Sequence, residues 1–331
     1  MKIGIAGLGF MGATHVAAIQ KIPGLELAAV CTTNERALSG DLTEVGGNLD
    51  LAPAKYDFSA LHKCREWRDL VADAELDAVD ICLPTDLHTE VAIAALERGK
   101  HVLCEKPMAL NRADCDRMIA AAKSAGRVLM IGQVLRFWPE YEVLRDAVRE
   151  KRYGAVRQVE FRRSAGLPDW SRWLPQEARS GGAVVDLLVH DIDQAVALFG
   201  MPKTVSAKSL GAEDTIDAAL DYGEGGPPVR IKGGWLPVGT PFSMGFRLEA
   251  ERGTLELGGD GLFLEDEAGR RAMEAPKGDG YRNELAYFAE CCSRGLRPER
   301  CPPEESAAGI ALALLLKDSR AKEGQTIQCS D

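Results

Sequence analysis

Residues 1–12 read MKIGIAGLGFMG, and this stretch decides the fold. The apolar run 2–6 predicts a short buried strand, and residues 13–19 predict a helix. Three glycines between them have the G-x-G-x-x-G spacing of a turn that binds a dinucleotide. They permit a tight turn, a close approach of backbone amides to a pyrophosphate, and close packing of the helix. A glycine-rich turn without a ligand is the alternative. We expect five residues of this turn to bind the cofactor, namely Gly7, Gly9, Phe10, Met11 and Gly12.

The bulk properties are those of a globular protein with two domains. The chain has 331 residues, of which 46% are hydrophobic and 27% charged, and no apolar run is long enough to cross a bilayer. The net charge of −10 lacks the basic block that a nucleic-acid partner requires. Met1 leads directly into the first strand, and the nine cysteines show no C-x-x-C pair. We therefore expect a cytoplasmic protein with reduced thiols and no nucleic-acid or membrane partner.

The end of the second expected strand, 25–31, bears on the choice of cofactor. An acidic residue there usually accepts hydrogen bonds from the adenosine ribose of NAD. In this chain Thr32 takes that position and Thr33 follows. Because no carboxylate repels a 2′-phosphate, and Arg36 is placed to pair with one, we favour NADP slightly over NAD. The alternative is that Glu35 binds the ribose and Arg36 is a solvated helix residue.

A third strand, expected over 76–83, ends at the same edge of a parallel, doubly wound sheet. Ligands bind at that edge in open α/β folds. We therefore expect Pro84, Thr85 and His88 to line the cofactor groove. For His88 the alternative is a purely structural role.

A fourth strand, expected over 101–105, ends in Glu105-Lys106-Pro107. Proline keeps the preceding residue extended, so the ammonium of Lys106 is aimed rather than free to wander. The Lys106–Pro107 bond is a candidate for the cis form. We expect Glu105 and Lys106 to contact the cofactor, and the cofactor domain to span 1–132.

The rest of the chain, 133–331, has a different rhythm. Its strand-like runs follow one another through turns that contain glycine, which indicates a largely antiparallel sheet. Helices expected over 281–293 and 304–322 can cover one face of this sheet. The other face is then available to a partner subunit, so we expect a homo-oligomer, either a dimer or a tetramer. Residues 38–62, in the first half, show no period and are expected to form loops.

A helix expected over 183–199 carries candidate catalytic residues. Asp186, His190 and Asp193 recur at i, i+4 and i+7, away from the apolar stripe. A carboxylate and an imidazole one turn apart can reach the same small ligand, although a polar face alone is more often solvated. We expect no metal site there, because no further histidine or cysteine supports these residues.

The glycine turn, Glu105-Lys106-Pro107 and the run Gly181-Gly182-x(3)-Asp186-x(3)-His190 together resemble the Gfo/Idh/MocA oxidoreductases. This family includes glucose–fructose oxidoreductase and inositol dehydrogenase, and the resemblance extends over nearly the whole chain. It implies a Rossmann domain followed by an α/β domain whose open sheet serves oligomerisation. It also implies that Lys106, Asp186 and His190 form the active site above the nicotinamide.

Such a site supports hydride transfer between a hydroxyl-bearing carbon of a sugar, polyol or related molecule and nicotinamide C4. The hydroxyl proton must leave as well, and histidine suits the role of general base, which we assign to His190. Lys106 would stabilise the alkoxide and Asp186 would hold a neighbouring hydroxyl. Three residues of an earlier loop are expected to shape the substrate pocket, or else only anchor the loop: Trp170, Arg172 and Trp173.

Two other functions stay open. One is a redox-neutral enzyme that keeps its cofactor, as in glycoside cleavage or oxidoreduction between two sugars. The other is a regulator that binds NAD(P) without catalysis. Release of NAD(P)H on adding substrate distinguishes the first of these from a dehydrogenase, and the presence of Lys106, Asp186 and His190 together disfavours the regulator.

Overall fold

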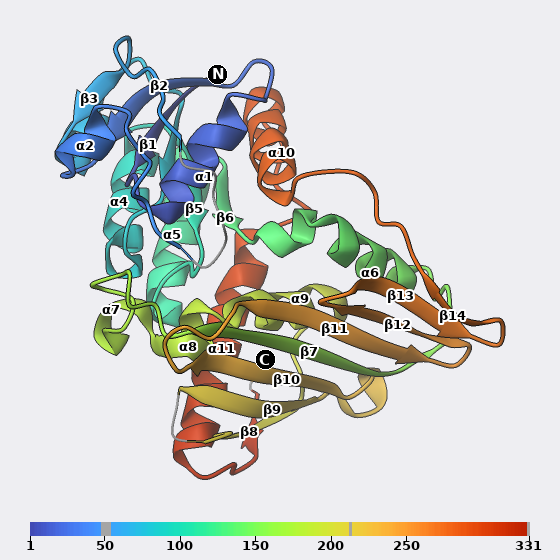
Figure 1. Cartoon of the computed structure of the whole chain (residues 1–331). Helices are drawn as coiled ribbons and strands as arrows, with labels where there is room; N and C mark the ends of the chain where they lie inside the picture. The colour runs from blue at the N-terminus through green and yellow to red at the C-terminus, as the bar shows by residue number, and fades with distance from the viewer. Residues whose placement is uncertain (48–53, 212–213, 330–331) are drawn as a thin grey trace. The chain divides into compact units, whose positions relative to one another are not determined.

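The computed structural model describes residues 1–47, 54–211 and 214–329. The chain forms two compact units, which are 1–134 with 279–307, and 135–278 with 308–331 (Figure 1). Each unit contains one sheet, and the predicted fold class is confirmed. The predicted division of roles at residue 132, with the cofactor before it and substrate and assembly after it, stays a prediction.

The described part of the first unit contains a six-stranded parallel sheet in the order β3-β2-β1-β4-β5-β6, which is the strand order of a Rossmann fold. Its strands are β1 (Lys2–Ala6), β2 (Glu26–Cys31), β3 (His62–Cys64), β4 (Ala78–Ile81), β5 (His101–Glu105) and β6 (Leu129–Gly132). The central strands are apolar and buried because helices cover both faces of such a sheet. The carboxyl ends of β1, β4 and β5 therefore lie next to one another at one edge.

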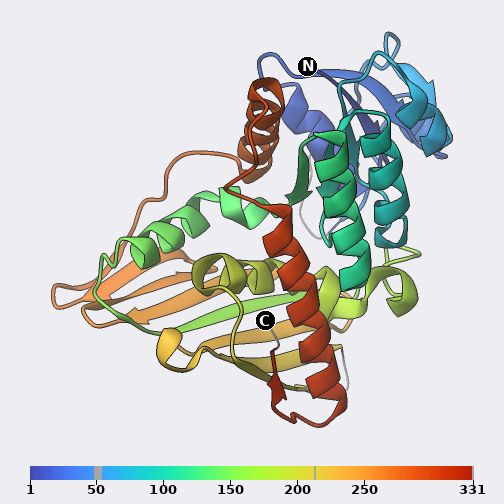
Figure 2. The same cartoon turned by 180° about the vertical axis from the view of Figure 1, so that it is seen from behind.

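The helices of the first unit connect and cover these strands. They are α1 (Phe10–Ile19), α2 (Glu35–Leu38), α3 (Trp67–Ala72), the 3-10 turn η1 (Thr85–Leu87), α4 (His88–Glu97), α5 (Arg112–Ala125) and α10 (Gly280–Arg294). Helices α4 and α5 lie side by side, as Figure 2 shows. Of the loop segment predicted over 38–62, residues 48–53 lie outside the described residues. The remainder is loop, apart from Leu38 at the end of α2, an isolated bridge between Asp41 and Lys55 and the start of β3.

Helix α10 forms where the sequence predicts a helix, but the prediction that it covers the second sheet is wrong. It belongs to the first unit and packs against α1. Its buried residues include Leu285 and Phe288. The spacing of apolar residues predicts that a helix face is buried but not which surface buries it, because that surface comes from a distant part of the chain.

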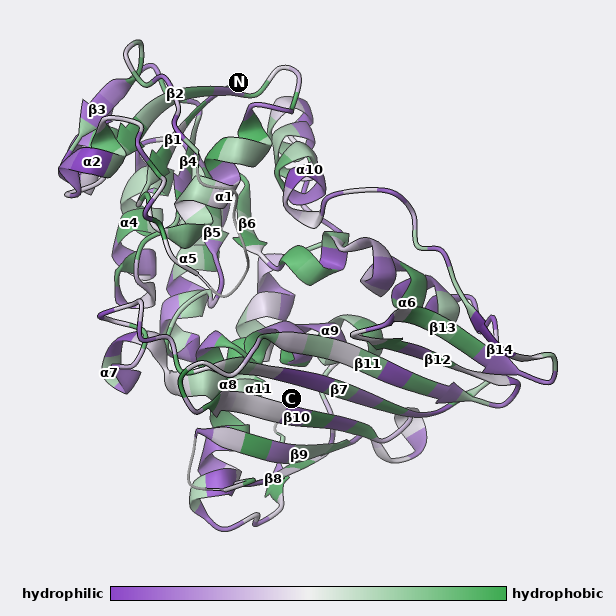
Figure 3. Cartoon of the chain, viewed as in Figure 1, coloured by the Kyte–Doolittle hydropathy of each residue, from purple (hydrophilic) through white to green (hydrophobic). Residues whose placement is uncertain are grey.

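The second unit contains, among its described residues, a nine-stranded sheet in the order β14-β13-β12-β11-β7-β10-β9-β8-β15. The neighbours are antiparallel except β7 and β10. Polar and apolar residues alternate over 159–162 of β7 and over 246–250 of β11, a pattern that is typical of a sheet with two different faces; Figure 3 colours the strands by hydropathy. The strands are β7 (Val156–Gly166), β8 (Thr204–Lys208), β9 (Thr215–Asp221), β10 (Val229–Leu236), β11 (Ser243–Ala250), β12 (Gly253–Gly258), β13 (Gly261–Asp266), β14 (Gly269–Ala272) and β15 (Ile327–Gln328).

The helical segments that belong wholly or largely to this unit are η2 (Val134–Phe137), α6 (Pro139–Arg149), α7 (Glu177–Ser180), α8 (Gly182–Asp186), α9 (Val189–Phe199), η3 (Gly223–Gly225) and α11 (Pro303–Ala321). The single helix predicted over 183–199 is in fact α8 and α9, separated by a break at residues 187–188. The amide of Leu188 bonds to the carbonyl of Ala183, five residues back, so the regular helical ladder is interrupted there.

The described residues contain neither a helix that could span a membrane nor a disulfide. None of the helices that can be described is long and apolar enough to cross a membrane. All nine cysteines lie within the described ranges, and no disulfide joins any of them.

Candidate active site

The glycine turn between β1 and α1 leaves space for a phosphate group. Gly7 lies at φ +97°, and a Cβ there would collide with the backbone that follows β4. A Cβ on Gly12 would collide with the carbonyl oxygen of Gly7, so neither position accepts a side chain. At Gly9, the N-cap of α1, a Cβ would meet none of the atoms that the structure describes within 4 Å. This open space faces the N–H groups of the first turn, which contains Phe10 and Met11, and fits the predicted pyrophosphate site.

The predicted adenosine end of the site follows β2. Thr32 and Thr33 lie between β2 and α2, and the hydroxyl of Thr32 accepts a hydrogen bond from the amide of Asn34 at 3.2 Å. Glu35, the alternative ligand for the ribose, is exposed and forms an ion pair with Arg65 at 2.6 Å. The ribose contacts of these residues stay predictions.

Arg36 on α2 is already held by carboxylates of the loop that follows. Its Nε lies 3.1 Å from Oδ2 of Asp41, its Nη1 pairs with Glu44, and its Nη2 donates to the hydroxyl of Thr43 at 3.0 Å. A 2′-phosphate would therefore compete with two acidic side chains for this guanidinium. The side chain of Arg36 is 44% exposed, which leaves it accessible to a ligand.

His88 ties together two loops at the carboxyl edge of the sheet. It is buried at the start of α4, with Nδ1 2.8 Å from the carbonyl oxygen of Pro107 and Nε2 2.8 Å from that of Leu83. Burial lowers the pKa of His88, and the two carbonyl contacts only partly offset this. Both ring nitrogens thus face backbone atoms of this chain, which is the geometry expected if His88 has a purely structural role.

Pro84 and Thr85 form the loop between β4 and α4. Pro84 precedes the 3-10 turn, and the hydroxyl of Thr85 is buried without a hydrogen-bond partner among the described residues. A buried hydroxyl of this kind usually has a partner, either protein, water or ligand. The position is consistent with the predicted cofactor groove, and the contact itself stays a prediction.

Lys106 leaves the sheet at the edge that also carries the glycine turn. It follows Glu105, the last residue of β5, and its bond to Pro107 is cis, as the sequence suggested. The backbone amide of Lys106 donates to Oε2 of Glu105 at 3.2 Å. Since β5 neighbours β4 and β4 neighbours β1, the strand order itself places this lysine near the proposed dinucleotide site.

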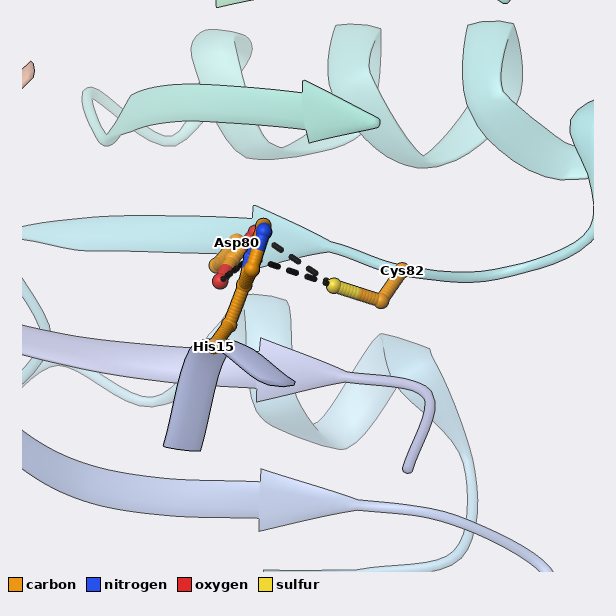
Figure 4. Close-up of side chains that lie close together, drawn as sticks. All are labelled: His15, Asp80 and Cys82. Atoms are coloured by element: carbon orange, nitrogen blue, oxygen red, sulfur yellow. Dashed lines mark hydrogen bonds and ion pairs between the residues drawn. The ribbon is translucent and has the colours of Figure 1, made fainter. Parts of the chain in front are cut away.

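A buried polar cluster beneath this edge was missed in the sequence. His15 of α1, Asp80 of β4 and Cys82 just after β4 lie together, as Figure 4 shows. A carboxylate within an otherwise apolar strand, at Asp80, is the feature that would have indicated it. His15 also lies close to Glu105 and Glu284. Within each of these two sets of three residues, one around Asp80 and one around Glu105, the nitrogen, oxygen and sulfur atoms that could bind a metal lie within 4.8 Å of one another. The Nδ1 of His15 is 2.8 Å from Asp80, which is a hydrogen-bond distance, so an ion pair accounts for the contact without a metal.

In the second unit the predicted catalytic residues lie on either side of the helix break. Asp186 ends α8 and is buried, whereas His190 is half-buried in the first turn of α9. Gly181, the N-cap of α8, and Gly182, its first residue, have φ of +84° and +77°, and a Cβ on Gly181 would crowd the side chain of Val185. The glycine pair is therefore required for the chain to enter this helix.

Asp193, which the spacing groups with Asp186 and His190, is engaged in a buried ion pair. It is buried and receives two hydrogen bonds of 2.7 Å from Arg136. Asp191 is paired in the same way with Arg163, whose Nε lies 2.7 Å from its Oδ2. Burial raises the pKa of Asp191 while Arg163 opposes the rise. These two buried pairs anchor α9, the helix that bears His190.

The three predicted pocket residues follow β7. Trp170 is 42% exposed, Arg172 is exposed and Trp173 is half-buried. Tryptophan rings stack on ligands through their flat apolar faces, which is the role that the sequence predicts for this loop. Their role in substrate binding stays a prediction.

Two family models match the chain. Residues 1–133 match a model described as "Oxidoreductase family, NAD-binding Rossmann fold". Residues 141–256 match a model described as "GFO/IDH/MocA C-terminal domain".

Named relatives are similar in sequence. A myo-inositol 2-dehydrogenase of Thermotoga maritima is 32% identical over 243 residues, covering 72% of this chain and 67% of that protein. A levoglucosan dehydrogenase of Pseudarthrobacter phenanthrenivorans is 31% identical, over 62% of this chain and 53% of its own length. A D-xylose 1-dehydrogenase (NADP(+)) of Haloferax volcanii is 28% identical over 93% of this chain and 94% of its own. The levoglucosan dehydrogenase is thus matched over little more than half of its length.

Solved structures share the fold. A levoglucosan dehydrogenase in complex with NADH and L-sorbose superposes with a TM-score of 0.84, over 100% of this chain and 99% of that one. At 19% sequence identity the likeness concerns the fold. The same arrangement of elements therefore occurs in a protein that holds NADH.

Proposed function

The chain belongs to the GFO/IDH/MocA oxidoreductase family, and from this premise we propose that it is an NAD(P)-dependent dehydrogenase of sugars or polyols. The proposed reaction transfers a hydride between a hydroxyl-bearing carbon and nicotinamide C4. One observation carries the proposal: Lys106 leaves β5 at the sheet edge that also bears the glycine turn. The relatives named as inositol, levoglucosan and xylose dehydrogenases support the same reaction class.

A bound NAD(P)⁺ supplies the hydride acceptor. The proposal gives His190 the role of general base that removes the hydroxyl proton, because histidine titrates near neutral pH. The ammonium of Lys106 stabilises the negative charge that develops on the substrate oxygen. Asp186 accepts a hydrogen bond from a neighbouring substrate hydroxyl. In the reducing direction His190 and Lys106 return the proton.

The proposed cofactor is NAD or NADP, and NADP is slightly favoured. The absence of an acidic residue at Thr32 supports this preference, since a carboxylate there would repel the 2′-phosphate. Arg36 is the proposed partner of that phosphate, although Asp41 and Glu44 compete for it. The xylose dehydrogenase of Haloferax volcanii carries NADP in its name, which is consistent with this choice.

A cofactor-reduction screen tests the function. The purified chain is mixed with NAD⁺ or NADP⁺ and a panel of polyols, aldoses and sugar acids, and reduced nicotinamide is followed by absorbance. We expect continuous reduction with at least one alcohol, and a fall in kcat of roughly a hundredfold in His190→Asn and in Lys106→Met. Lys123→Met, which changes an exposed lysine of α5, is the matched control and is expected to retain activity.

Two results of this screen would overturn the proposal. Reduction limited to one cofactor per protein, without release, indicates the redox-neutral alternative. No reduction with any alcohol, together with dinucleotide binding that neither variant alters, indicates a regulator without catalysis.

We also propose a cytoplasmic homo-oligomer, formed through the second sheet. The alternation of polar and apolar residues along β7 and β11 supports a sheet whose second face meets another copy. Light scattering after size-exclusion chromatography tests the assembly, and a mass equal to one chain at micromolar concentration would refute it.

A further inference from the structure

His15 spans two carboxylates on neighbouring strands of the first sheet. It is fully buried on α1, and its Nδ1 lies 2.8 Å from Oδ2 of Asp80 on β4 (Figure 4). Its Nε2 lies 3.3 Å from Oε1 of Glu105, the last residue of β5, in a charge contact without hydrogen-bond alignment. One imidazole thus connects the helix that follows the glycine turn to the ends of β4 and β5.

The surroundings of His15 favour its charged form. Burial by itself would lower the pKa of His15, but its contacts with Asp80 and with Cys82 outweigh this and raise the pKa well above its ordinary value. Burial raises the pKa of the Cys82 thiol, so that group is neutral. The titratable groups that face the ring come from β4, β5 and α10: Asp80, Cys82, Glu105, Tyr281 and Glu284. A positive imidazolium is the state that such an acidic, dry surrounding stabilises.

Glu105 connects the ring of His15 to the backbone of Lys106. Its Oε2 accepts the backbone N–H of Lys106 at 3.2 Å, while its Oε1 faces His15. On the far side Gly132 of β6 lies against the carboxylate: a Cβ at this position would lie 2.9 Å from Oε1 of Glu105, so the carboxylate would have to shift. The carboxylate is therefore confined by an imidazolium, a backbone amide and the surface of the next strand.

We propose that His15 is a positioning residue for Lys106: through Glu105 it holds the backbone from which the lysine side chain projects. This inference rests on the proposed function for its catalytic meaning, because Lys106 is the lysine that the function requires. It also relates the two ends of the cofactor site. The helix whose first turn is proposed to bind the pyrophosphate carries, one turn further on, the residue that constrains the lysine.

Amide exchange in the full chain tests the contact without any substrate. In His15→Gln, which keeps a polar side chain of similar length without the charge, we expect the Lys106 amide to exchange roughly tenfold faster than in the wild type. The exchange is measured by deuterium uptake of peptides that contain residues 102–108. After correction for intrinsic exchange, the protection of this amide falls in the wild type as pH rises through the pKa of His15, and in His15→Gln it shows no such step.

Two further variants keep the test informative if His15→Gln folds poorly. Asp80→Asn keeps the shape of the cluster but removes the charge that keeps His15 protonated, so it is expected to act in the same direction. Val16→Ala removes a fully buried side chain from the same helix without touching the cluster, and is the matched control. A protein in which Val16→Ala loosens the Lys106 amide as much as His15→Gln, or in which neither polar variant does, contradicts the proposal.

Turnover is the second readout. With the alcohol found in the screen, His15→Gln is expected to lower kcat roughly tenfold while the Kd of NADH, measured by fluorescence, changes by less than about twofold. An equal loss in kcat and in NADH affinity would instead indicate a general defect of the helix and overturn the proposal. If no alcohol is oxidised, the proposed function fails, and amide exchange still decides the role of His15.

Discussion

Arg36 carries the proposed cofactor preference, and the residues around it oppose that preference. Asp41 accepts hydrogen bonds from Thr43, which, with the ion pairs to Lys55 and Arg36, hold the pKa of its carboxyl below the ordinary range. Asp41 is therefore a permanent anion beside the guanidinium. A phosphate must displace this carboxylate or share the guanidinium with it, so the net gain from Arg36 is smaller than for an unpaired arginine.

Replacing Arg36 measures this gain. In Arg36→Ala we expect the affinity for NADPH to fall about tenfold, equivalent to about 1.4 kcal/mol, because one charge-assisted contact to the 2′-phosphate is lost. The affinity for NADH should stay the same, and both are measured by fluorescence titration. Arg65→Ala, which removes the exposed partner of Glu35, is the matched control. Equal effects on NADH and NADPH would show that Arg36 does not contact the 2′-phosphate.

At the scale of the element, α1 begins with glycines that have different duties. A side chain at Gly12 collides with the carbonyl of Gly7, whereas a Cβ at Gly9 meets no described atom within 4 Å. Gly12 is therefore needed by the fold, whereas Gly9 is needed only if a ligand approaches. Stability and cofactor binding can therefore be separated on one helix.

The pair Gly12→Ala and Gly9→Ala tests this separation. Gly12→Ala is expected to destabilise the protein by roughly 1–3 kcal/mol, because the backbone must move to relieve the contact. Gly9→Ala is expected to leave the melting temperature almost unchanged but to weaken NADH binding at least about tenfold, since the methyl group occupies the proposed pyrophosphate space. The measurements are thermal unfolding and fluorescence titration. NADH affinity that survives in Gly9→Ala would rule out the pyrophosphate at this turn.

On the scale of the whole molecule, three buried or half-buried histidines contribute to the dependence of stability on pH. Burial lowers the pKa of His88 and of His101, so the stability associated with them is present above about pH 6.5 and is lost as the pH falls below it. His15 has the opposite sign, because its pKa is raised in the folded state. Its contribution is complete below about pH 6.5 and is lost as the pH rises through its folded-state pKa.

Comparison of the wild type with His15→Gln isolates the contribution of His15 to the pH dependence of stability. Above about pH 6.5 we expect the wild type to lose about 1.4 kcal/mol of unfolding free energy per pH unit relative to the variant, until the pKa of folded His15 is reached. Urea denaturation between about pH 6 and pH 9 measures the difference, since linear extrapolation yields the free energy at each pH. A constant difference across this range would mean that His15 is neutral in the folded protein.

The sequence by itself determined the elements that depend on local pattern. The glycine turn, the parallel alternation of strands and helices and the Glu105-Lys106-Pro107 end of a strand are all encoded in short stretches, because turn geometry and burial act over a few residues. The tertiary structure decided what those elements face. The packing of α10 on α1, the pairing of Asp193 with Arg136 and the cluster around His15 join distant parts of the chain. The spacing of apolar residues predicts that a surface is buried, but it does not predict which surface covers it. A buried charged side chain forms an ion pair only after folding has brought its partner close.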